Sequence, residues 1–267
     1  MYYFLYHRTT APTGRVLARA LGFRFCGRRP KKERGNYNLV LRWGSSLTFP
    51  ASLEINYAEG ISRAADKLST FRILQDAGVS IVPFTTNPNE LDGLVYGRSR
   101  FGSRGNNIRV FEEGTQPYGC EFYTQGVDIY REYRIHVVGE QVVRVQGKYL
   151  DFPEQDMTGG RVYNYANGYR FKTPQKLLPL QQEQEAIMAV KSLGLDFGAV
   201  DLIVDENKKH YILEVNTGPS CSPMTARAYI TALAALIAER TEGRWEPQVN
   251  TDALSALRHC SPVTGGN

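Results

Sequence analysis

The sequence of 267 residues predicts an α+β protein, in which strand-rich and helical stretches follow one another along the chain. A strand-rich stretch runs over 94–145 and includes a hairpin turn at Gly139-Glu140. Apolar residues recur with helical spacing over 61–77, 180–193 and 223–240. Two apolar strands, 198–204 and 210–216, flank a polar tip and form the last predicted hairpin.

The N-terminal 60 residues are expected to form a small α/β lobe, with a helix over 15–21 and a strand over 39–43. The helix over 61–77 is closed by Gly78, and a short strand over 79–84 follows it. The polar, glycine-rich segment 151–171 is expected to be a long loop, and loops of that length are commonly functional. The tail beyond 245 is expected to be peripheral.

Composition bounds the class of protein. Hydrophobic residues make up 42% and charged residues 22%, which is ordinary for a globular chain. No apolar run could span a bilayer and no secretory signal opens the chain, so the cytoplasm is the expected location. The four cysteines lie far apart without metal-ligand spacing and are expected to be free thiols.

The net charge is +5, with a pI near 9.0. Much of the excess lies in two basic stretches, 24–34 and 98–109. Such stretches indicate either an anionic partner, such as a nucleotide, nucleic acid or acidic peptide, or a solvated basic surface. The charge alone does not favour nucleic acid.

Two acids are predicted to meet on the last hairpin. Side chains alternate faces along a strand, so Glu214 and Asn216 point the same way. If Asn207-Lys208 forms a two-residue turn, Asp201 pairs directly with Glu214, at roughly 5 Å. A divalent cation would relieve their repulsion, since Mg²⁺ takes oxygen ligands from carboxylates and phosphates. The alternative is a hairpin with one wet face and two solvated acids.

A glycine-rich stretch, 97–105, lies between two predicted strands. A P-loop or a dinucleotide-binding motif would need a helix to start there, so both are excluded. Such a strand–turn–strand segment can lie over phosphates as a flap, with its backbone N–H groups and arginines as donors. The alternative is an exposed basic hairpin.

Several cations converge on one strand face. Glu132, Arg134 and His136 share one strand face within the segment 131–137, and the hairpin partner of this strand leads to Arg144 and Lys148. Three cations together require anions nearby. A lone strand histidine is usually structural, and we expect that role for His136.

In chain order these motifs resemble the ATP-grasp fold. The segments that carry the resemblance are 65–83, 97–105, 120–123, 132–138, Asp201 and Glu214-Val215-Asn216-Thr217-Gly218-Pro219. The resemblance covers about residues 39–238. The nearest relatives look like the carboxylate–amine ligases that include the ribosomal-protein glutamate ligases, and viral ligases with a short N-terminal lobe look closer still. A virus-encoded member would work in the host cytoplasm.

The resemblance implies two α+β lobes that clamp ATP, preceded by the short α/β lobe. The boundaries would be 1–60 for the N-terminal lobe, 61–125 for the small ATP-grasp lobe with the flap, 126–245 for the large lobe with the metal site, and 246–267 for the tail.

The resemblance also implies the site. Asp201, Glu214 and Asn216 would hold Mg²⁺, or Mn²⁺ as a substitute, on the ATP phosphates. Nucleotide-binding positions would be Lys67, Arg98, Gly102, Ser103, Gly105 and the adenine hinge Glu121, Phe122 and Tyr123. Arg98 stands where the family usually has lysine, which keeps the charge and changes the geometry.

The implied reaction joins a carboxylate to an amine through an acyl phosphate and releases ADP and phosphate. Arg134 and Lys148 are the expected catalytic residues, with Arg134 stabilising the oxyanion at the acyl carbon. The acceptor amine could belong to an amino acid, a peptide or a protein. No pattern identifies the carboxylate, the amine or an oligomeric state.

Three alternatives stay open. The same fold could attach an amino acid to a nucleic-acid base, or could bind nucleotide without turnover. A basic RNA-binding protein without an ATP site would need stacked aromatics, for which Tyr163, Tyr165 and Tyr169 are the candidates.

Overall fold

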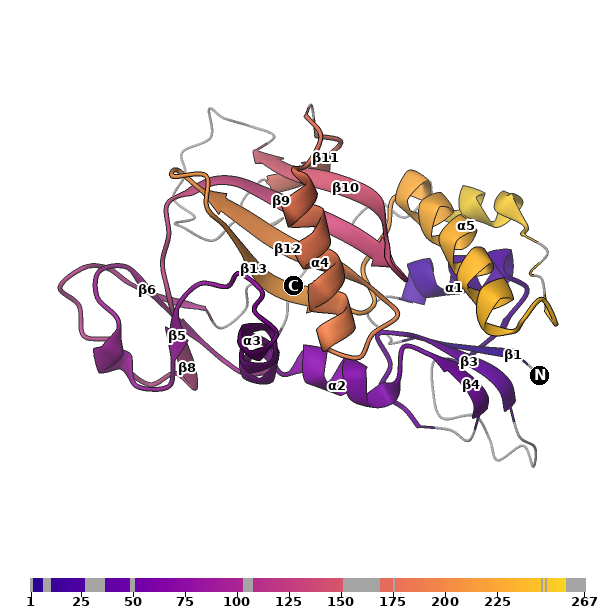
Figure 1. Ribbon diagram of the computed structural model, residues 1–267, viewed down its shortest axis with the longest axis horizontal. Coiled ribbons are helices and arrows are strands. Elements are labelled where there is room, and N and C mark those ends of the chain that lie inside the picture. The colour runs from indigo at the N-terminus through magenta and orange to yellow at the C-terminus, as the bar shows by residue number, and fades with distance from the viewer. Residues whose placement is uncertain are drawn as a thin grey trace, which may run out of the picture.

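A computed structural model of the chain describes residues 2–6, 11–26, 37–48, 51–102, 108–150, 169–174, 176–245, 247 and 249–257. Within these ranges the chain forms three sheets with helices packed against them (Figure 1). Among the described residues no helix is long and apolar enough to cross a membrane. Cys120 and Cys221, whose side chains are described, are free thiols as expected.

The N-terminal region forms a parallel sheet in which β1 lies between β2 and β3, with β4 at the edge next to β3. Its strands are β1 (Tyr2–Tyr6), β2 (Arg24–Cys26), β3 (Tyr37–Trp43) and β4 (Ala51–Ile55). Helix α1 (Ala11–Ala20) makes the crossover from β1 that a parallel pair requires. The expected helix and strand are both confirmed and are longer than expected.

The single helix expected over 61–77 is wrong, because the chain breaks at Asp66. Two helices stand there instead, α2 (Ala58–Ala65) and α3 (Lys67–Asp76). The Asp66 backbone is extended, with φ −89° and ψ 101°. Its carboxylate accepts the N–H of Ser69 at 3.2 Å, which is the N-cap contact that starts a new helix. The break makes Lys67 the first residue of α3.

The small sheet is antiparallel and lies at one end of the molecule (Figure 1). Its order is β5 (Phe84–Thr85), β8 (Phe122–Gln125), β6 (Val95–Arg98) and β7 (Arg109–Phe111), with the short helix η2 (Pro88–Glu90) between β5 and β6. The strand expected over 79–84 is wrong for most of its length. That segment instead runs beside β13, where the Ile212 N–H donates to the Ser80 carbonyl at 2.8 Å.

The large sheet has five strands in the order β11, β10, β9, β12, β13. The strands are β9 (Ile129–Val138), β10 (Gln141–Leu150), β11 (Tyr169–Lys172), β12 (Phe197–Asp205) and β13 (His210–Asn216). The hairpin turn at Gly139-Glu140 is confirmed. Strand β11 lies within the segment expected to be a loop, so that expectation is wrong for 169–171, while 151–168 lie outside the described residues.

Strands β12 and β13 pair Asp201 with Glu214 as expected, but the turn and the strand register that produce this pairing differ from the expected ones. The Asp205 N–H donates to the Lys209 carbonyl at 2.8 Å, so the turn is longer than the two residues expected. This offset is cancelled by a register shift between Asp201 and Leu202, where a bulge adds one residue to β13. The two deviations compensate, and the acids still face each other.

The two faces of the large sheet differ in chemistry. Helix α4 (Leu180–Ser192) covers one face (Figure 1). Beneath it lie buried apolar residues of the sheet: Ile135, Val137, Val200, Leu202, Val204, Ile212 and Val215. Because side chains alternate, Arg134, Asp201 and Glu214 lie on the opposite face.

Helix α5 (Pro223–Arg240) joins the large sheet to the N-terminal sheet. Tyr229 on α5 contacts both Trp43 of β3 and Phe197 of β12, with ring centroids 5.0 Å and 6.1 Å away. The tail contributes η3 (Thr251–Leu257), and Leu254 and Leu257 are buried in the same core. The expected lobe boundaries stay a prediction. The core that contains Leu254 and Leu257 includes residues on both sides of the expected boundary at residue 60.

Candidate active site

A row of polar side chains crosses the face of the large sheet opposite α4. Arg134 on β9 pairs with Asp201 on β12, which pairs with Glu214 on β13. On its other side Arg134 pairs with Gln146 on β10. Directly paired side chains lie about 5 Å apart, so the sheet register alone brings one cation and two acids together.

Arg134 binds Asp201 through two hydrogen bonds. Its Nε donates to Oδ1 at 2.6 Å and its Nη2 donates to Oδ2 at 2.7 Å. Only 19% of the Arg134 side chain and 9% of the Asp201 side chain are exposed. Burial favours loss of the Arg134 proton, but the Asp201 carboxylate outweighs it and raises the pKa of Arg134. This planar fork holds the guanidinium in one orientation.

Glu214 is held by a lysine from another part of the chain. The Lys67 Nζ lies 2.6 Å from Glu214 Oε2, and the Asn216 Nδ2 donates to Glu214 Oε1 at 2.8 Å. Burial would raise the pKa of Glu214, yet Lys67, with Asn216 and Arg134, lowers it to about 2. In this structure Arg134 and Lys67 neutralise the two acids, and the expected metal site stays a prediction.

The donor set still fits Mg²⁺. Two carboxylates and an amide lie on one face, and hard oxygen ligands of this kind, completed by phosphate oxygens, suit that ion. The Asn216 nitrogen now faces both acids, at 2.8 Å from Glu214 and 3.4 Å from Asp201. A metal held by its oxygen requires the amide to rotate. Across the described residues no cluster of three or more histidine, cysteine or acidic side chains could hold a metal ion.

A second ion pair lies in the next row of the same face. Lys148 on β10 pairs with Glu132 on β9, and both side chains are almost fully buried. Burial raises the pKa of Glu132 to about 7, although Lys148 opposes the shift. The ring of Phe171 on β11 lies 4.5 Å from Arg134 Cζ and 5.5 Å from Lys148 Nζ. One aromatic ring therefore touches both expected catalytic cations.

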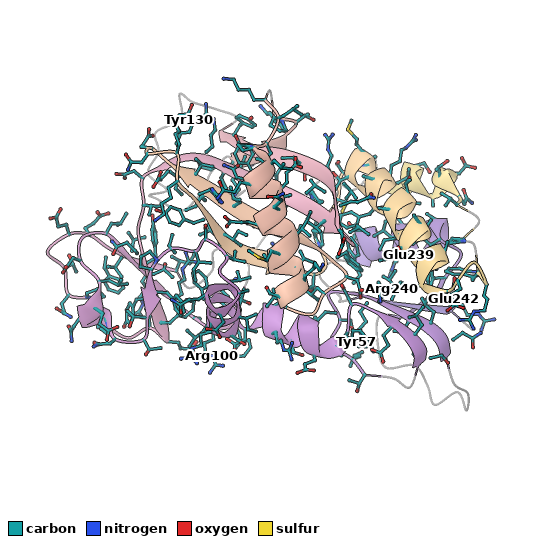
Figure 2. The ribbon with its side chains drawn as sticks, viewed as in Figure 1. Tyr57, Arg100, Tyr130, Glu239, Arg240 and Glu242 are labelled. Carbon is teal, nitrogen blue, oxygen red and sulfur yellow. The ribbon has the colours of Figure 1, made fainter. Side chains whose placement is uncertain are left out.

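The base of the flap is tied to the start of α3. The Arg100 guanidinium pairs with the Asp66 carboxylate, and the Lys67 N–H donates to the Arg100 carbonyl at 2.8 Å. The Arg100 N–H in turn donates to Glu121 Oε2 at 2.9 Å. Figure 2 shows Arg100 beside α3. These contacts place Glu121 at the flap base.

Arg98 points from β6 toward the acids. Its Nε donates to Thr124 Oγ1 at 3.0 Å. Burial lowers the pKa of Arg98, and the charge of Glu214 opposes that shift. Arg98 therefore interacts electrostatically with Glu214, in addition to Lys67 and Arg134.

Two residues of the expected adenine hinge have buried side chains. Phe122 packs in the core beside Phe71, with ring centroids 5.9 Å apart. Tyr123 packs against Phe111, and its hydroxyl accepts the Cys120 N–H at 3.2 Å. Any contact they make with a nucleotide would come from the backbone. Gly102 is the last described residue of the flap, and Ser103 and Gly105 lie outside the described residues.

His136 has the structural role expected. It is fully buried, and burial lowers its pKa to about 4. Its Nδ1 lies 3.1 Å from the Tyr229 hydroxyl and its Nε2 lies 2.8 Å from Gln146 Oε1. A neutral imidazole satisfied on both nitrogens links β9, β10 and α5.

The structure brings together five of the predicted site residues: Lys67, Arg134, Asp201, Glu214 and Asn216. Sequence reasoning missed Phe171, Asp66 and Arg100. Phe171 was hidden because its segment reads as a loop. Asp66 was detectable as an N-cap followed by Ser69, had the helix break been considered.

Solved structures share this architecture. D-alanine–D-alanine ligase from Bacillus anthracis superposes with a TM-score of 0.63 at 14% identity, covering 91% of this chain and 99% of that chain. The ATP-grasp ligase PsnB, complexed with a minimal precursor, gives 0.60 at 14% identity, covering 96% and 98%. The macrocyclase MdnC from Microcystis aeruginosa MRC, bound with precursor peptide MdnA, gives 0.54 at 15% identity, covering 89% and 100%.

No protein-family profile and no curated protein matches the sequence. The identities to the solved structures are low, so the likeness establishes the fold. The chain has the α+β ATP-grasp fold. The B. anthracis ligase has also been solved with ATP, and PsnB with Mg and ADP.

Proposed function

We propose that this protein is an ATP-dependent ligase that joins a carboxylate to an amine through an acyl phosphate. The observation that carries the proposal is the row formed by Arg134, Asp201 and Glu214, with Lys67 from α3, on the face of an ATP-grasp sheet opposite α4. Acids and cations at this density suit a polyphosphate with a divalent ion.

Asp201, Glu214 and Asn216 would hold Mg²⁺. When bound, the ion neutralises charge on the phosphate oxygens. Lys67 would turn toward the phosphates, since its ammonium lies beside Glu214, and Arg98 would add a second positive charge there. The base of the flap, through Arg100 and Glu121, would set the position of the glycine-rich segment over the nucleotide.

The reaction would run in two steps. A carboxylate oxygen of the substrate attacks the γ-phosphorus, the bond to the β-phosphate oxygen breaks, and ADP leaves. The amine nitrogen then attacks the acyl carbon, loses a proton, and expels phosphate. Arg134 would stabilise the oxyanion at the acyl carbon, and Lys148 would stand beside it under the same aromatic ring.

We infer an amino acid or peptide as the acceptor. The proposal draws on the resemblance to ribosomal-protein glutamate ligases and on the peptide precursors present in the MdnC and PsnB structures. The stacked-tyrosine alternative has no support in the described residues, where Tyr169 lies on β11 and the other two tyrosines are not described.

The test is ADP release from purified protein with Mg²⁺ and ATP, across panels of carboxylates, amino acids, peptides and nucleic acids. The proposal expects release that requires both a carboxylate and an amine, with a new amide in the product by mass spectrometry. ATP binding without ADP release across the panels would instead indicate a nucleotide-binding module. Product mass on a nucleic-acid acceptor alone would overturn the choice of acceptor.

A further inference from the structure

All four oxygens of the two acids accept a contact from a protein donor. Arg134 takes both oxygens of Asp201, at 2.6 Å and 2.7 Å. Lys67 and Asn216 take the two oxygens of Glu214, at 2.6 Å and 2.8 Å. The two negative charges are matched by the two cations in direct contact with them, so a free divalent cation meets ligands that are already neutralised and engaged.

The two cations differ in how easily they can leave. Arg134 is fixed by a bidentate fork, by its place in the sheet and by the Phe171 ring at 4.5 Å. Lys67 reaches Glu214 through one N–O contact at the end of a flexible stem. The Lys67 ammonium is therefore the cation that can dissociate from Glu214, provided that another anion binds it.

Lys67 is the first residue of α3, and its backbone is tied to the base of the flap rather than to the large sheet. Its N–H donates to the Arg100 carbonyl at 2.8 Å, and the preceding Asp66 pairs with the Arg100 side chain. The Lys67–Glu214 pair thus spans the base of the flap and the large sheet, and a triphosphate between them would offer Lys67 a second partner.

We propose that Lys67 makes the metal site selective for a metal–nucleotide complex. Its ammonium holds Glu214 while no nucleotide is bound and excludes free divalent cations. A triphosphate draws the ammonium away and supplies further oxygen ligands, so the metal enters together with the nucleotide. The inference rests on the proposed function, because it assumes that Glu214 becomes a metal ligand.

The test measures Mn²⁺ binding to the nucleotide-free protein, with free Mn²⁺ followed by electron paramagnetic resonance. Lys67→Met removes the ammonium at nearly constant side-chain length, and Lys67→Arg keeps a positive charge. Lys191→Met is the matched control, since Lys191 also pairs with a glutamate at 2.6 Å, on the exposed surface away from the site. Lys67→Met with Glu214→Gln reports whether any gained binding is at Glu214.

Lys67→Met is expected to bind Mn²⁺ without nucleotide about tenfold or more tightly than wild type, because a positive charge beside the ligand has been removed. Lys67→Arg and Lys191→Met should match wild type, and the added Glu214→Gln change should abolish the gain. Circular dichroism confirms that each variant is folded.

Equal Mn²⁺ affinity for wild type and Lys67→Met would overturn the inference, as would a gain that survives Glu214→Gln. If wild type gains an Mn²⁺ site with ATP that Glu214→Gln removes, the proposed function stands and the inference alone has failed. If no Mn²⁺ binds at Glu214 even with ATP, the proposed metal site and the inference both fail.

Discussion

Asp201 and Glu214 face each other on neighbouring strands, and each is neutralised by a cation from a different part of the chain. Arg134 comes from the next strand of the same sheet, and Lys67 comes from the first turn of α3. Removing one partner of a buried pair costs more than the intact pair contributes, because the remaining charge stays buried. The predictions near the site follow from this difference between losing one partner and keeping the intact pair.

Two substitutions of Arg134 distinguish the effect of its positive charge from the effect of its two hydrogen bonds to Asp201. Arg134→Lys keeps the charge but loses the fork on Asp201, and turnover is expected to fall about 100-fold, as for a lost oxyanion donor. Arg134→Met leaves Asp201 without that cation and should cost about 3 kcal/mol of unfolding free energy. ADP release and urea unfolding measure the two effects. Full turnover by Arg134→Lys would contradict the role proposed for the fork.

Asp66 should contribute to stability as a helix cap. Asp66→Ala loses both the Ser69 contact and the Arg100 pair, and its unfolding free energy is expected to fall by about 1–2 kcal/mol. Asp66→Asn keeps an oxygen for the Ser69 N–H and should lie between wild type and Asp66→Ala in thermal unfolding. An alanine variant as stable as wild type would show that the break between α2 and α3 does not depend on this cap.

Asn56 joins the N-terminal sheet to the large sheet. It is fully buried with φ +57°, and its side-chain oxygen accepts the N–H groups of Asp196 and Phe197 at 2.8 Å and 3.0 Å. Asn56→Ala leaves these donors unpaired and should cost roughly 3 kcal/mol or more of unfolding free energy. Asn56→Gly loses the same contacts without the strain of a left-handed backbone, so it should be about 1 kcal/mol more stable than Asn56→Ala. The reverse order in chemical denaturation would contradict this account.

Glu132 predicts a pH dependence of stability. Burial raises its pKa from an ordinary value of 4.5 to about 7, so the folded state holds the proton more tightly than the unfolded state. Its contribution to stability is fully present below pH 4.5 and is lost as the pH rises through about 7. Glu132→Gln cannot ionise, so its stability relative to wild type should increase between pH 4.5 and pH 7. A constant difference between the two unfolding free energies over that range would contradict the shift.

The shared face of Glu214 and Asn216 could be predicted from the sequence, because side chains two residues apart on a strand point the same way. The pairing of Asp201 with Glu214 also depended on the assumed turn. The turn could not be assigned correctly. The predicted pairing of Asp201 with Glu214 is correct only because a bulge in β13 compensates for the longer turn. Local pattern does not reveal such compensations.

The partners of the acids could not be predicted in the same way. Lys67 lies 147 residues before Glu214, and nothing in the local sequence connects them. The apolar spacing of α2 and α3 runs through Asp66, so the break that places Lys67 at a helix start was hidden. Phe171 was missed because β11 is a short edge strand that follows a polar, glycine-rich segment.

The most direct test of the central claim is calorimetric titration of ATP, with and without Mg²⁺, into wild type and into the double variant Asp201→Asn, Glu214→Gln. We predict that Mg²⁺ strengthens ATP binding to wild type and has no such effect on the folded double variant, which lacks both anionic ligands. A double variant that binds ATP with the full Mg²⁺-dependent affinity of wild type would show that these acids do not hold the metal–nucleotide complex.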